Sequence, residues 1–174
     1  FGSVSVPNFE DWKNQNTVFA GIAPYSFTSF NLEGRDTPQR IPGINVGTNY
    51  FDVLGVKPTL GRAFLPGEDV AGNERVVVIS DDLWRTRFGA SEAAVGSAIT
   101  LNAQPFTIVG VAGPKFLGGV SGLSHDMWVP MGAQFDAGLV GRRLGAPQLG
   151  AVDRDDPGVV LAGRGVHRHA RGEV

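Results

Sequence analysis

The sequence predicts an α+β domain in which short strands and helices are mixed along the chain, with small sheets and helices packed on one side of them. Strand-like and helix-like segments alternate irregularly, and the regular strand–helix–strand order of a parallel α/β fold does not develop. The apolar run at residues 76–79 is typical of a buried central strand. No segment repeats at a fixed period.

The first half of the chain is expected to contain two helices and two strands. In chain order they are a helix from about Pro7 to Phe19, strands over residues 22–32 and 39–46, and a short helix over residues 50–54. Pro42 favours an edge position or a bulge in the second strand, because proline has no N–H to donate to a neighbouring strand. Thr48 or Asn49 is expected to cap the short helix, which ends at Gly55.

The second half is expected to contain one helix and several strands. They are a strand over residues 75–79, a helix that follows Ser80 and ends at Gly89, a hairpin of strands over 98–101 and 106–111, and a short strand over 127–129. Ser80 is predicted to cap the helix, with Asp81 and Asp82 favourably placed in its first turn. Trp84 and Phe88 are four positions apart and should form its buried stripe.

Composition excludes several classes of function. The 174 residues carry a formal net charge of −2, which provides no basic field for nucleic acid and no polybasic membrane patch. Cysteine is absent, so disulfides and thiolate metal sites are excluded. No apolar stretch is long enough to span a membrane, and the chain begins at Phe1 instead of Met. We therefore expect a soluble excerpt whose membrane anchor lies outside it.

Composition also changes near residue 136, which predicts two parts. The aromatic residues, 3 Trp, 2 Tyr and 11 Phe, all lie at or before Phe135, whereas residues 137–174 are rich in Gly and Arg. We expect a partial core domain at residues 1–136 and a tail at 137–174 that is disordered, because it has little apolar surface to bury. The tail is read either as a flexible linker or as a frameshift product of a GC-rich gene, and the abrupt break favours the second.

Motifs for catalysis are absent. The sequence has no Walker A motif, dinucleotide glycine pattern, HExxH pattern or nucleophile elbow. His167 and His169 alternate in the tail, but a third metal ligand is not evident. His125 and Asp126, with Ser121 nearby, are the strongest candidates for an acid–base site, although neighbouring residues on a strand point to opposite faces.

Other polar and aromatic groups have simpler explanations. The Asp81–Asp82 pair is explained by charge placement at a helix N-terminus. Glu68–Asp69 close to Arg62 is expected to form a surface ion pair and not a metal site. Tyr25, Phe27 and Phe30 lack the basic surroundings of a nucleic-acid stacking platform, so they are expected in the core or against a partner. We predict no catalytic, cofactor-binding or metal-binding residue, and a protein that works through its surfaces.

A series of strings in a fixed order carries a family resemblance. The main ones are SVPNFEDW at 5–12, NYFDVLGVKP at 49–58, GRAF at 61–64, VVIS at 77–80, FTIVGV at 106–111 and MWVP at 127–130. Over about residues 3–131 the sequence resembles the MacB-like periplasmic core domain of bacterial ABC-transporter permeases, and most of all the acidobacterial-type permeases. The motif positions, to which we assign structural roles, are Asn49, Tyr50, Phe51, Leu54, Gly55, Pro58, Gly61, Arg62, Trp84, Phe88, Gly89, Gly110, Trp128 and Pro130.

The resemblance implies a part in transport without chemistry of its own. Such a domain lies on the periplasmic side of the inner membrane and transmits the ATP-driven motion of membrane helices to a periplasmic substrate or partner. ATP would bind a separate cytoplasmic ATPase domain or subunit, so no cofactor is expected in this chain. The implied partners are the transporter's membrane helices, its ATPase subunit and a periplasmic adaptor protein, with a dimer in the intact transporter. The alternatives are a stand-alone extracytoplasmic module that binds a ligand or protein, and an enzyme built on His125, Asp126 and Ser121.

Overall fold

The computed structural model describes residues 21–34, 37–70, 72–73, 75–116, 118, 124–134, 148–152 and 160–162. Its strands are β1 (Ile22–Glu33), β2 (Gln39–Val46), β3 (Leu60–Gly61), β4 (Val76–Ile79), β5 (Ala98–Leu101), β6 (Gln104–Val111), β7 (Met127–Pro130), β8 (Gln148–Val152) and β9 (Val160–Ala162). Its helices are α2 (Tyr50–Val53), α3 (Asp81–Phe88) and the short 3-10 helices η1 (Glu92–Ala94) and η2 (Met131–Gln134).

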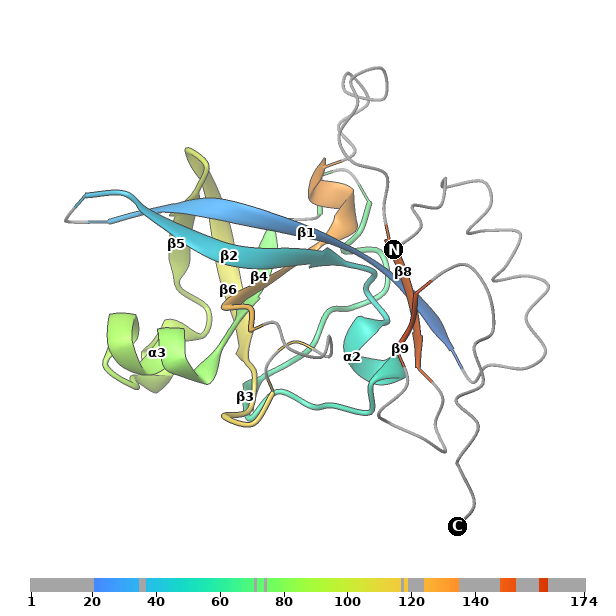
Figure 1. Cartoon of the computed structure of the whole chain (residues 1–174). Helices are drawn as coiled ribbons and strands as arrows, with labels where there is room; N and C mark the ends of the chain where they lie inside the picture. Colours follow the sequence, from blue (N-terminus) through green and yellow to red (C-terminus); the bar gives the residue numbers. More distant parts are fainter. Residues whose placement is uncertain are drawn as a thin grey trace, which may run out of the picture.

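Most of these strands form a closed ring. The sheet order runs β2–β7–β4–β6–β5–β1, and β1 also pairs with β2, so the first and last of these strands meet. β1 and β2 pair antiparallel along most of their length, whereas β1 pairs with β5 only at Leu32 and Glu33. In Figure 1 the β1–β2 hairpin runs across the upper part of the view, and α2 and α3 lie below it. We call these six strands the strand ring.

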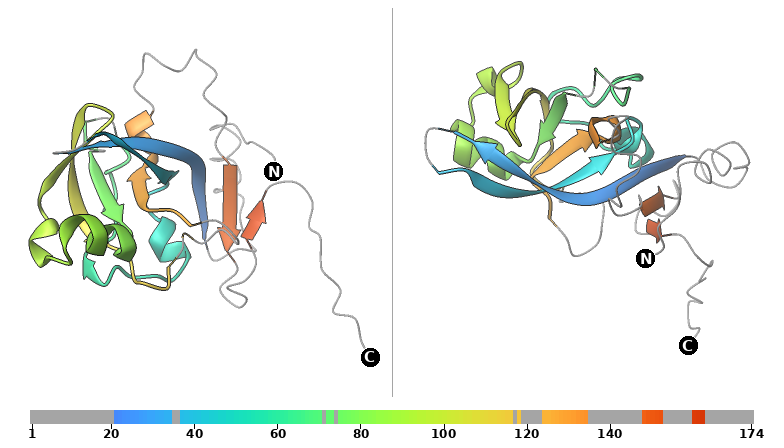
Figure 2. Two further views of the ribbon diagram at one scale, coloured as in Figure 1. Left: turned by 60° about the vertical axis from the view of Figure 1, so that its left-hand side comes forward. Right: turned by 90° about the horizontal axis from the view of Figure 1, so that it is seen from above.

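The α+β class predicted from the sequence is confirmed, with one difference in the sheets. The described strands join in one sheet, not in several small ones. β8 pairs with the first residues of β1, Ile22–Tyr25, and β9 pairs with β8. Figure 2 shows this pair of strands beside one end of β1, away from α3. One sheet arises because β1, at twelve residues, is long enough to pair with β2, β5 and β8 in turn.

β4 is the central strand that its apolar sequence predicts. It pairs in parallel with β6 and antiparallel with β7, and Val77, Val78 and Ile79 are fully buried. A register shift between Val77 and Val78 marks a bulge in the pairing with β6. Pro42 lies in β2 opposite Ser29 of β1, just before the residues that pair with β7. β2 is therefore not an edge strand, and Pro42 lies where its pairing with β7 begins, with its carbonyl accepting from the Asp126 N–H at 3.0 Å.

Two apolar clusters lie on opposite faces of the ring, because successive side chains of a strand point in opposite directions. On β7, Met127 and Val129 belong to one cluster and Trp128 to the other. The first cluster contains residues from every strand of the ring together with Leu83 of α3, and we call it the interior cluster. The second lies under α2, and we call it the α2 cluster. Its fully or largely buried members are Ala23, Tyr25, Ile44, Val46, Tyr50, Phe51, Phe64, Val78, Val109, Ala112 and Trp128.

The ends of α3 and the β5–β6 hairpin follow their sequence signals. The Ser80 Oγ accepts a hydrogen bond from the N–H of Leu83 at 3.0 Å, and Gly89 ends the helix in the left-handed conformation with φ 60°. The hairpin turns at Asn102 and Ala103, both with positive φ, as a two-residue turn of the primed type requires. The predicted cap of α3 and the predicted hairpin are confirmed.

Two local predictions need correction. Leu83 is the buried residue of α3, whereas Trp84 and Phe88 are only partly buried at the margin of the interior cluster. The helix is short and meets the ring near its first turn, so the predicted stripe lies at the edge of the contact. Asn49 is at the N-cap position of α2, but its side chain makes no capping hydrogen bond; its Nδ2 donates to the carbonyl of Ile22 at 2.9 Å. That amide ties the start of β1 to α2 instead.

Some predictions fall outside the described residues. These include the helix from Pro7 to Phe19, Ser121, and the histidines at 167 and 169. The boundary after residue 136 stays a prediction, although β8 and β9 lie within the expected tail and pair with β1 through β8.

Candidate functional site

The motif segment at residues 49–62 forms a corner on the outside of the strand ring. α2 places Tyr50 and Phe51 in the α2 cluster, where both are buried. The ring of Phe51 lies 5.7 Å from that of Phe64, 5.6 Å from that of Phe116 and 5.9 Å from that of Trp128, measured between centroids. Ring centroids at these separations are typical of aromatic pairs whose interaction stabilises a fold beyond the burial of their apolar area. The corner is therefore attached to β7 by packed aromatic rings.

Gly61 and Gly110 allow two backbones to meet at this corner. They pair with each other between β3 and β6. A Cβ on Gly61 would overlap the carbonyl oxygen of Val109, and a Cβ on Gly110 would overlap that of Arg62. Gly61 also has a φ of 72°, a region that favours glycine. Both motif glycines thus lie where two backbones approach too closely to leave room for a side chain.

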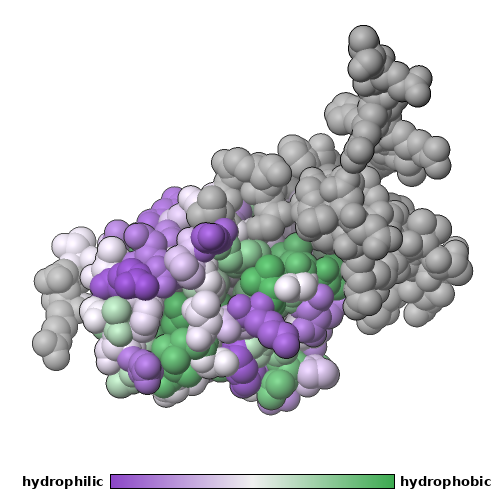
Figure 3. Space-filling model, turned by 90° about the horizontal axis from the view of Figure 1, so that it is seen from below, coloured by the Kyte–Doolittle hydropathy of each residue, from purple (hydrophilic) through white to green (hydrophobic). Residues whose placement is uncertain are grey.

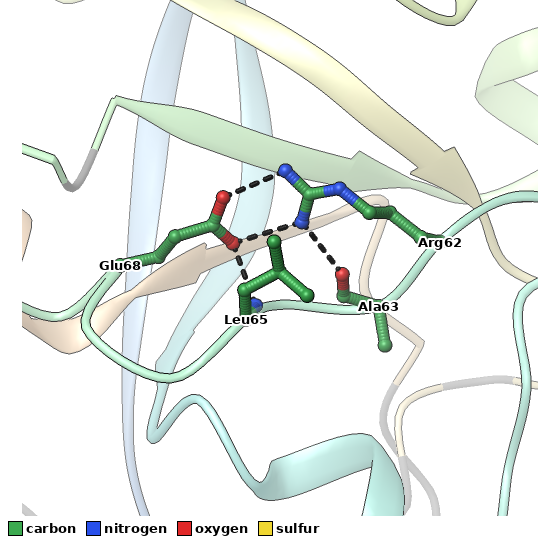
Figure 4. Close-up of polar contacts among 4 residues, drawn as sticks. All are labelled: Arg62, Ala63, Leu65 and Glu68. Atoms are coloured by element: carbon green, nitrogen blue, oxygen red, sulfur yellow. Dashed lines mark hydrogen bonds and ion pairs between the residues drawn. The ribbon is translucent and has the colours of Figure 1, made fainter.

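Arg62 and Glu68 close the loop that follows this corner (Figure 4). The guanidinium donates from Nη2 to Glu68 Oε1 at 2.7 Å and from Nη1 to Oε2 at 3.0 Å. Arg62 Nη1 also donates to the carbonyl of Ala63 at 2.9 Å, and the N–H of Leu65 donates to Glu68 Oε2 at 2.8 Å. The predicted ion pair is confirmed. It is bidentate, which is the geometry in which arginine recognises a carboxylate most specifically.

The electrostatics of this pair favour both charged forms. Partial burial acts to raise the pKa of Glu68, but hydrogen bonds from Arg62 and from the Leu65 N–H outweigh it, so that the pKa lies below its ordinary value. The hydrogen bond to Glu68 raises the pKa of Arg62. Both groups are therefore ionised throughout the physiological pH range. The ion pair persists over that range, and neither group acts as a proton donor or acceptor.

Two of the three acid–base candidates, His125 and Asp126, lie within the described residues. Asp126 accepts from Ser80 Oγ at 2.9 Å through Oδ1 and from the Ser80 N–H at 2.9 Å through its carbonyl, and its own N–H donates to Pro42. The carboxylate therefore bonds the start of β7 to the N-cap of α3, and the backbone of Asp126 bonds to Ser80 and to Pro42 of β2. His125 is buried, and its ring stacks on that of Phe27 with centroids 5.4 Å apart. Ser121, the third candidate, lies outside the described residues.

The remaining polar and aromatic candidates have structural positions. Asp81 pairs with Arg85 one turn along α3, with 2.6 Å between Oδ2 and Nε, and Asp82 is exposed. No group of three metal-ligating side chains gathers within the described residues. Tyr25 and Phe30 are buried in different clusters. On the face seen in Figure 3, hydrophobic residues gather in separate patches among hydrophilic ones.

The other motif positions lie around the same corner or around α3. Gly55 ends α2 with φ 66° and its Cβ position is open, and Leu54 and Pro58 are partly buried. Trp84 donates from Nε1 to the carbonyl of Ser91 at 2.8 Å, beside the turn at Gly89. Pro130 ends β7 and is buried. The structural roles assigned to the motif stay predictions, since these contacts describe positions and not effects.

Sequence reasoning missed the long-range partners of this corner. The hydroxyl of Tyr50 donates to the carbonyl of Gly118, and burial raises the pKa of Tyr50, helped by its neighbour Tyr25. A Cβ on Gly132 would overlap the carbonyl of Asp69, so η2 lies directly against the loop after Arg62. No local signal marks either contact, because the partners are more than sixty residues apart.

Comparisons with known proteins give the family. The model of the MacB-like periplasmic core domain matches residues 1–163, beyond residue 131, where the resemblance was expected to end. The chain is 33% identical over 134 residues to the macrolide export ATP-binding/permease protein MacB of Aggregatibacter actinomycetemcomitans, covering 75% of this chain and 19% of that protein. It is 31% identical over 124 residues to MacB of Hahella chejuensis, covering 70% and 18%. The chain thus spans about one fifth of these relatives.

Solved structures share the fold. The periplasmic region of MacB from Actinobacillus actinomycetemcomitans superposes with a TM-score of 0.63 at 21% identity, covering 89% of this chain and 68% of that one. The extracellular domain of the noncanonic ABC-type transporter YknZ from Gram-positive bacteria gives 0.61 at 20% identity, covering 78% and 67%. No helix within the described residues has the length and apolar character needed to cross a bilayer. Together with the match over residues 1–163, these findings show that the chain belongs to the family of MacB-like periplasmic core domains of ABC-transporter permeases.

Proposed function

We propose that this extracytoplasmic domain transmits the ATP-driven motion of transporter membrane helices to a substrate or partner on the periplasmic side of the inner membrane. The observation that carries the proposal is the family match over residues 1–163. The relatives are named ATP-binding/permease proteins, which supports ATP hydrolysis by a cytoplasmic ATPase domain or subunit of the transporter that lies outside this chain. The chain itself then binds no cofactor and catalyses no reaction, and it works as a dimer beside a periplasmic adaptor protein.

The architecture supports such a role physically. Transmission of a displacement needs a body that does not deform, and a closed ring of strands leaves no sheet edge along which the ring strands could slide apart. The corner at residues 49–62 is held to β7 by aromatic packing and to β6 by the Gly61–Gly110 contact. α3 is held to β7 by the Ser80–Asp126 hydrogen bonds. The outer elements therefore move with the ring.

The test uses the full-length permease that carries this domain, expressed with its ATPase in a macrolide-sensitive host. A macrolide is the first substrate to try, because the relatives are named for macrolide export. Trp128→Ala removes the buried centre of the α2 cluster and should lower macrolide tolerance to that of the empty host, while basal ATP hydrolysis continues. The matched control is Thr107→Ala, at an exposed position of β6. Full tolerance in a Trp128→Ala protein whose domain has melted would contradict transmission through this domain.

The stand-alone binding module is the alternative for the same chain. It predicts that the domain binds its ligand equally well when separated from the permease and that neither substitution alters ATP-driven export. The same pair of variants therefore separates the two functions.

A further inference from the structure

We propose that residues 65–70 form a docking surface for an extracytoplasmic protein that offers an apolar recess edged by a lysine or arginine. The inference rests on the proposed function, since a domain that transmits motion needs a surface on which a partner bears. The first observation is that two large hydrophobic side chains in this loop are exposed to solvent. Leu65 is 49% exposed and Val70 is 58% exposed, and they are two of the three large hydrophobic residues that are exposed within the described residues. Pro66 beside them is also exposed.

The third exposed residue, Phe27, has a neighbour that explains it. Its ring stacks on His125 and lies edge-on to Tyr25 with centroids 5.5 Å apart. Leu65 and Val70 have no such ring contact among the described residues. A single exposed aliphatic residue is ordinary on a protein surface. Here two such residues, with an exposed proline between them, place three exposed apolar side chains within six residues of chain.

The loop is held in one shape. The N–H of Glu68 donates to the carbonyl of Leu65 at 3.1 Å, and that of Val70 donates to Gly67 at 3.3 Å, so two tight turns follow one another. The Glu68 carboxylate accepts from Arg62 twice and from the Leu65 N–H. Leu65 and Val70 are thus presented by a braced backbone. A surface that is already ordered loses less conformational entropy when it binds, which favours recognition.

The loop is also fixed to the rest of the domain at both ends. Phe64, directly before Leu65, is buried in the α2 cluster against Phe51. Asp69, directly before Val70, has its carbonyl against Gly132 of η2. A force on the loop therefore passes to the ring through α2 and through the end of β7.

The charged side chains of the loop indicate which kind of partner it can bind. Arg62 and Glu68 neutralise each other, and Asp69 is exposed with no ion pair within the described residues. The surface therefore combines apolar side chains with one free carboxylate. An anionic lipid headgroup would be repelled by Asp69 and would find no free cation in the loop. A protein recess with a cationic edge complements both features.

The experiment places a photo-crosslinking residue in the full-length permease, in cells of its own source. Leu65→p-benzoylphenylalanine and Val70→p-benzoylphenylalanine are compared with Glu92→p-benzoylphenylalanine, an exposed control in η1. Because the three side chains are exposed, the domain should fold in each case, which thermal unfolding checks. Both loop positions should crosslink to the same extracytoplasmic protein, identified by mass spectrometry, and the control should not.

The charge is tested on that identified protein. Asp69→Lys should weaken its binding about ten-fold, and Asp69→Asn less, as expected for a charge at the rim of an interface. Reversal of the partner's crosslink-proximal lysine or arginine to glutamate should restore binding to the Asp69→Lys variant. This rescue is the result that establishes the surface, because a folding defect would not be rescued from the partner's side.

Several results would overturn the proposal. They are crosslinks to lipid alone, crosslinks to a second copy of the permease alone, no crosslink at either loop position, or unchanged binding for Asp69→Lys. If Leu65→Ser with Val70→Ser leaves macrolide export intact while Trp128→Ala abolishes it, the docking surface is wrong and the transmission role stands. If Trp128→Ala also leaves export intact, the transmission role fails independently.

Discussion

The interior cluster and the α2 cluster differ in the side chains that fill them. Inside the ring, aliphatic residues dominate, with Phe30 and Phe106 as the buried aromatic residues. The α2 cluster is built around Tyr25, Tyr50, Phe51, Phe64 and Trp128. A ring of few strands leaves room for little more than branched aliphatic chains, whereas large flat rings cover the irregular surface between a sheet and its loops. The interior thus closes the ring, and the α2 cluster attaches the outer segments to it.

The largest expected effect is at Trp128, the fully buried centre of the α2 cluster. Trp128→Ala should lower the free energy of unfolding by about 3–5 kcal/mol, because it removes a large buried aromatic group and leaves a cavity. Val129→Ala, one position along β7 and in the interior cluster, should cost about 2 kcal/mol from the lost apolar carbons. Urea unfolding of both variants makes the measurement. Equal losses would show that the two clusters do not differ in their contribution.

The next largest loss of stability is expected at Gly110, where the backbone of β6 contacts the backbone of Arg62. Gly110→Val should cost about 3 kcal/mol, since its side chain meets the carbonyl of Arg62, which belongs to a hydrogen-bonded backbone. Gly55→Ala is the control, because nothing lies within 4 Å of its Cβ position and only its positive φ is unfavourable, at about 1 kcal/mol. Thermal unfolding separates the two. A Gly110→Val protein as stable as the control would mean that β3 can move away from β6.

A smaller effect is expected at Trp84. Trp84 is partly buried on α3 and its indole N–H is bonded to Ser91, so Trp84→Ala should cost about 2 kcal/mol, below the range for a fully buried aromatic. Urea unfolding of Trp84→Ala and Trp128→Ala under the same conditions compares their losses of stability directly. A loss at Trp84 as large as that at Trp128 would show that the margin of the interior cluster is packed as tightly as the α2 cluster.

The smallest effect is expected at the brace of the exposed loop. Because the folded pKa of Glu68 lies below its unfolded value, the carboxylate stabilises the fold above the ordinary glutamate pKa of about 4.3, and this contribution is lost as the pH falls through the lower folded pKa. Glu68→Gln should therefore cost about 1 kcal/mol or less at neutral pH, since Arg62 is partly exposed. The difference from the unsubstituted protein should shrink below about pH 4. Unfolding curves from pH 3 to 7 measure it, and a difference that grew in acid would contradict this sign.

The interior was more predictable from sequence than the α2 cluster. The apolar run at Val76–Ile79, the Ser80 cap and the hairpin at Asn102–Ala103 are local signals, and each element formed where it was expected. The closure of the ring was not predicted, because the pairing of β1 with β5 depends on residues about seventy positions apart. Sequence periodicity shows which face of a strand is apolar but not which strand lies beside it.

The candidate corner was predicted in part. The motif strings identified the segment. The closeness of Arg62 and Glu68 in the sequence predicted their ion pair. The partners Gly118, Phe116 and Gly132 were not assigned, because each comes from a distant segment that carries no periodic pattern. Trp84 was assigned too deep a position, since helical spacing shows a shared face but not how much of the helix the sheet covers.

The length of β1 has a mechanical consequence. Its ladder to β2 runs over residues 25–32, and its first residues also pair with β8. When one long strand is pushed or pulled along its axis, the hydrogen bonds to its neighbour are loaded in shear and share the force, whereas a pull at right angles at one end would break them one after another. β1 is therefore stiff along its axis and weak to peeling at its ends. A displacement delivered parallel to β1 would cross the domain with little loss, and one delivered across it would open the sheet.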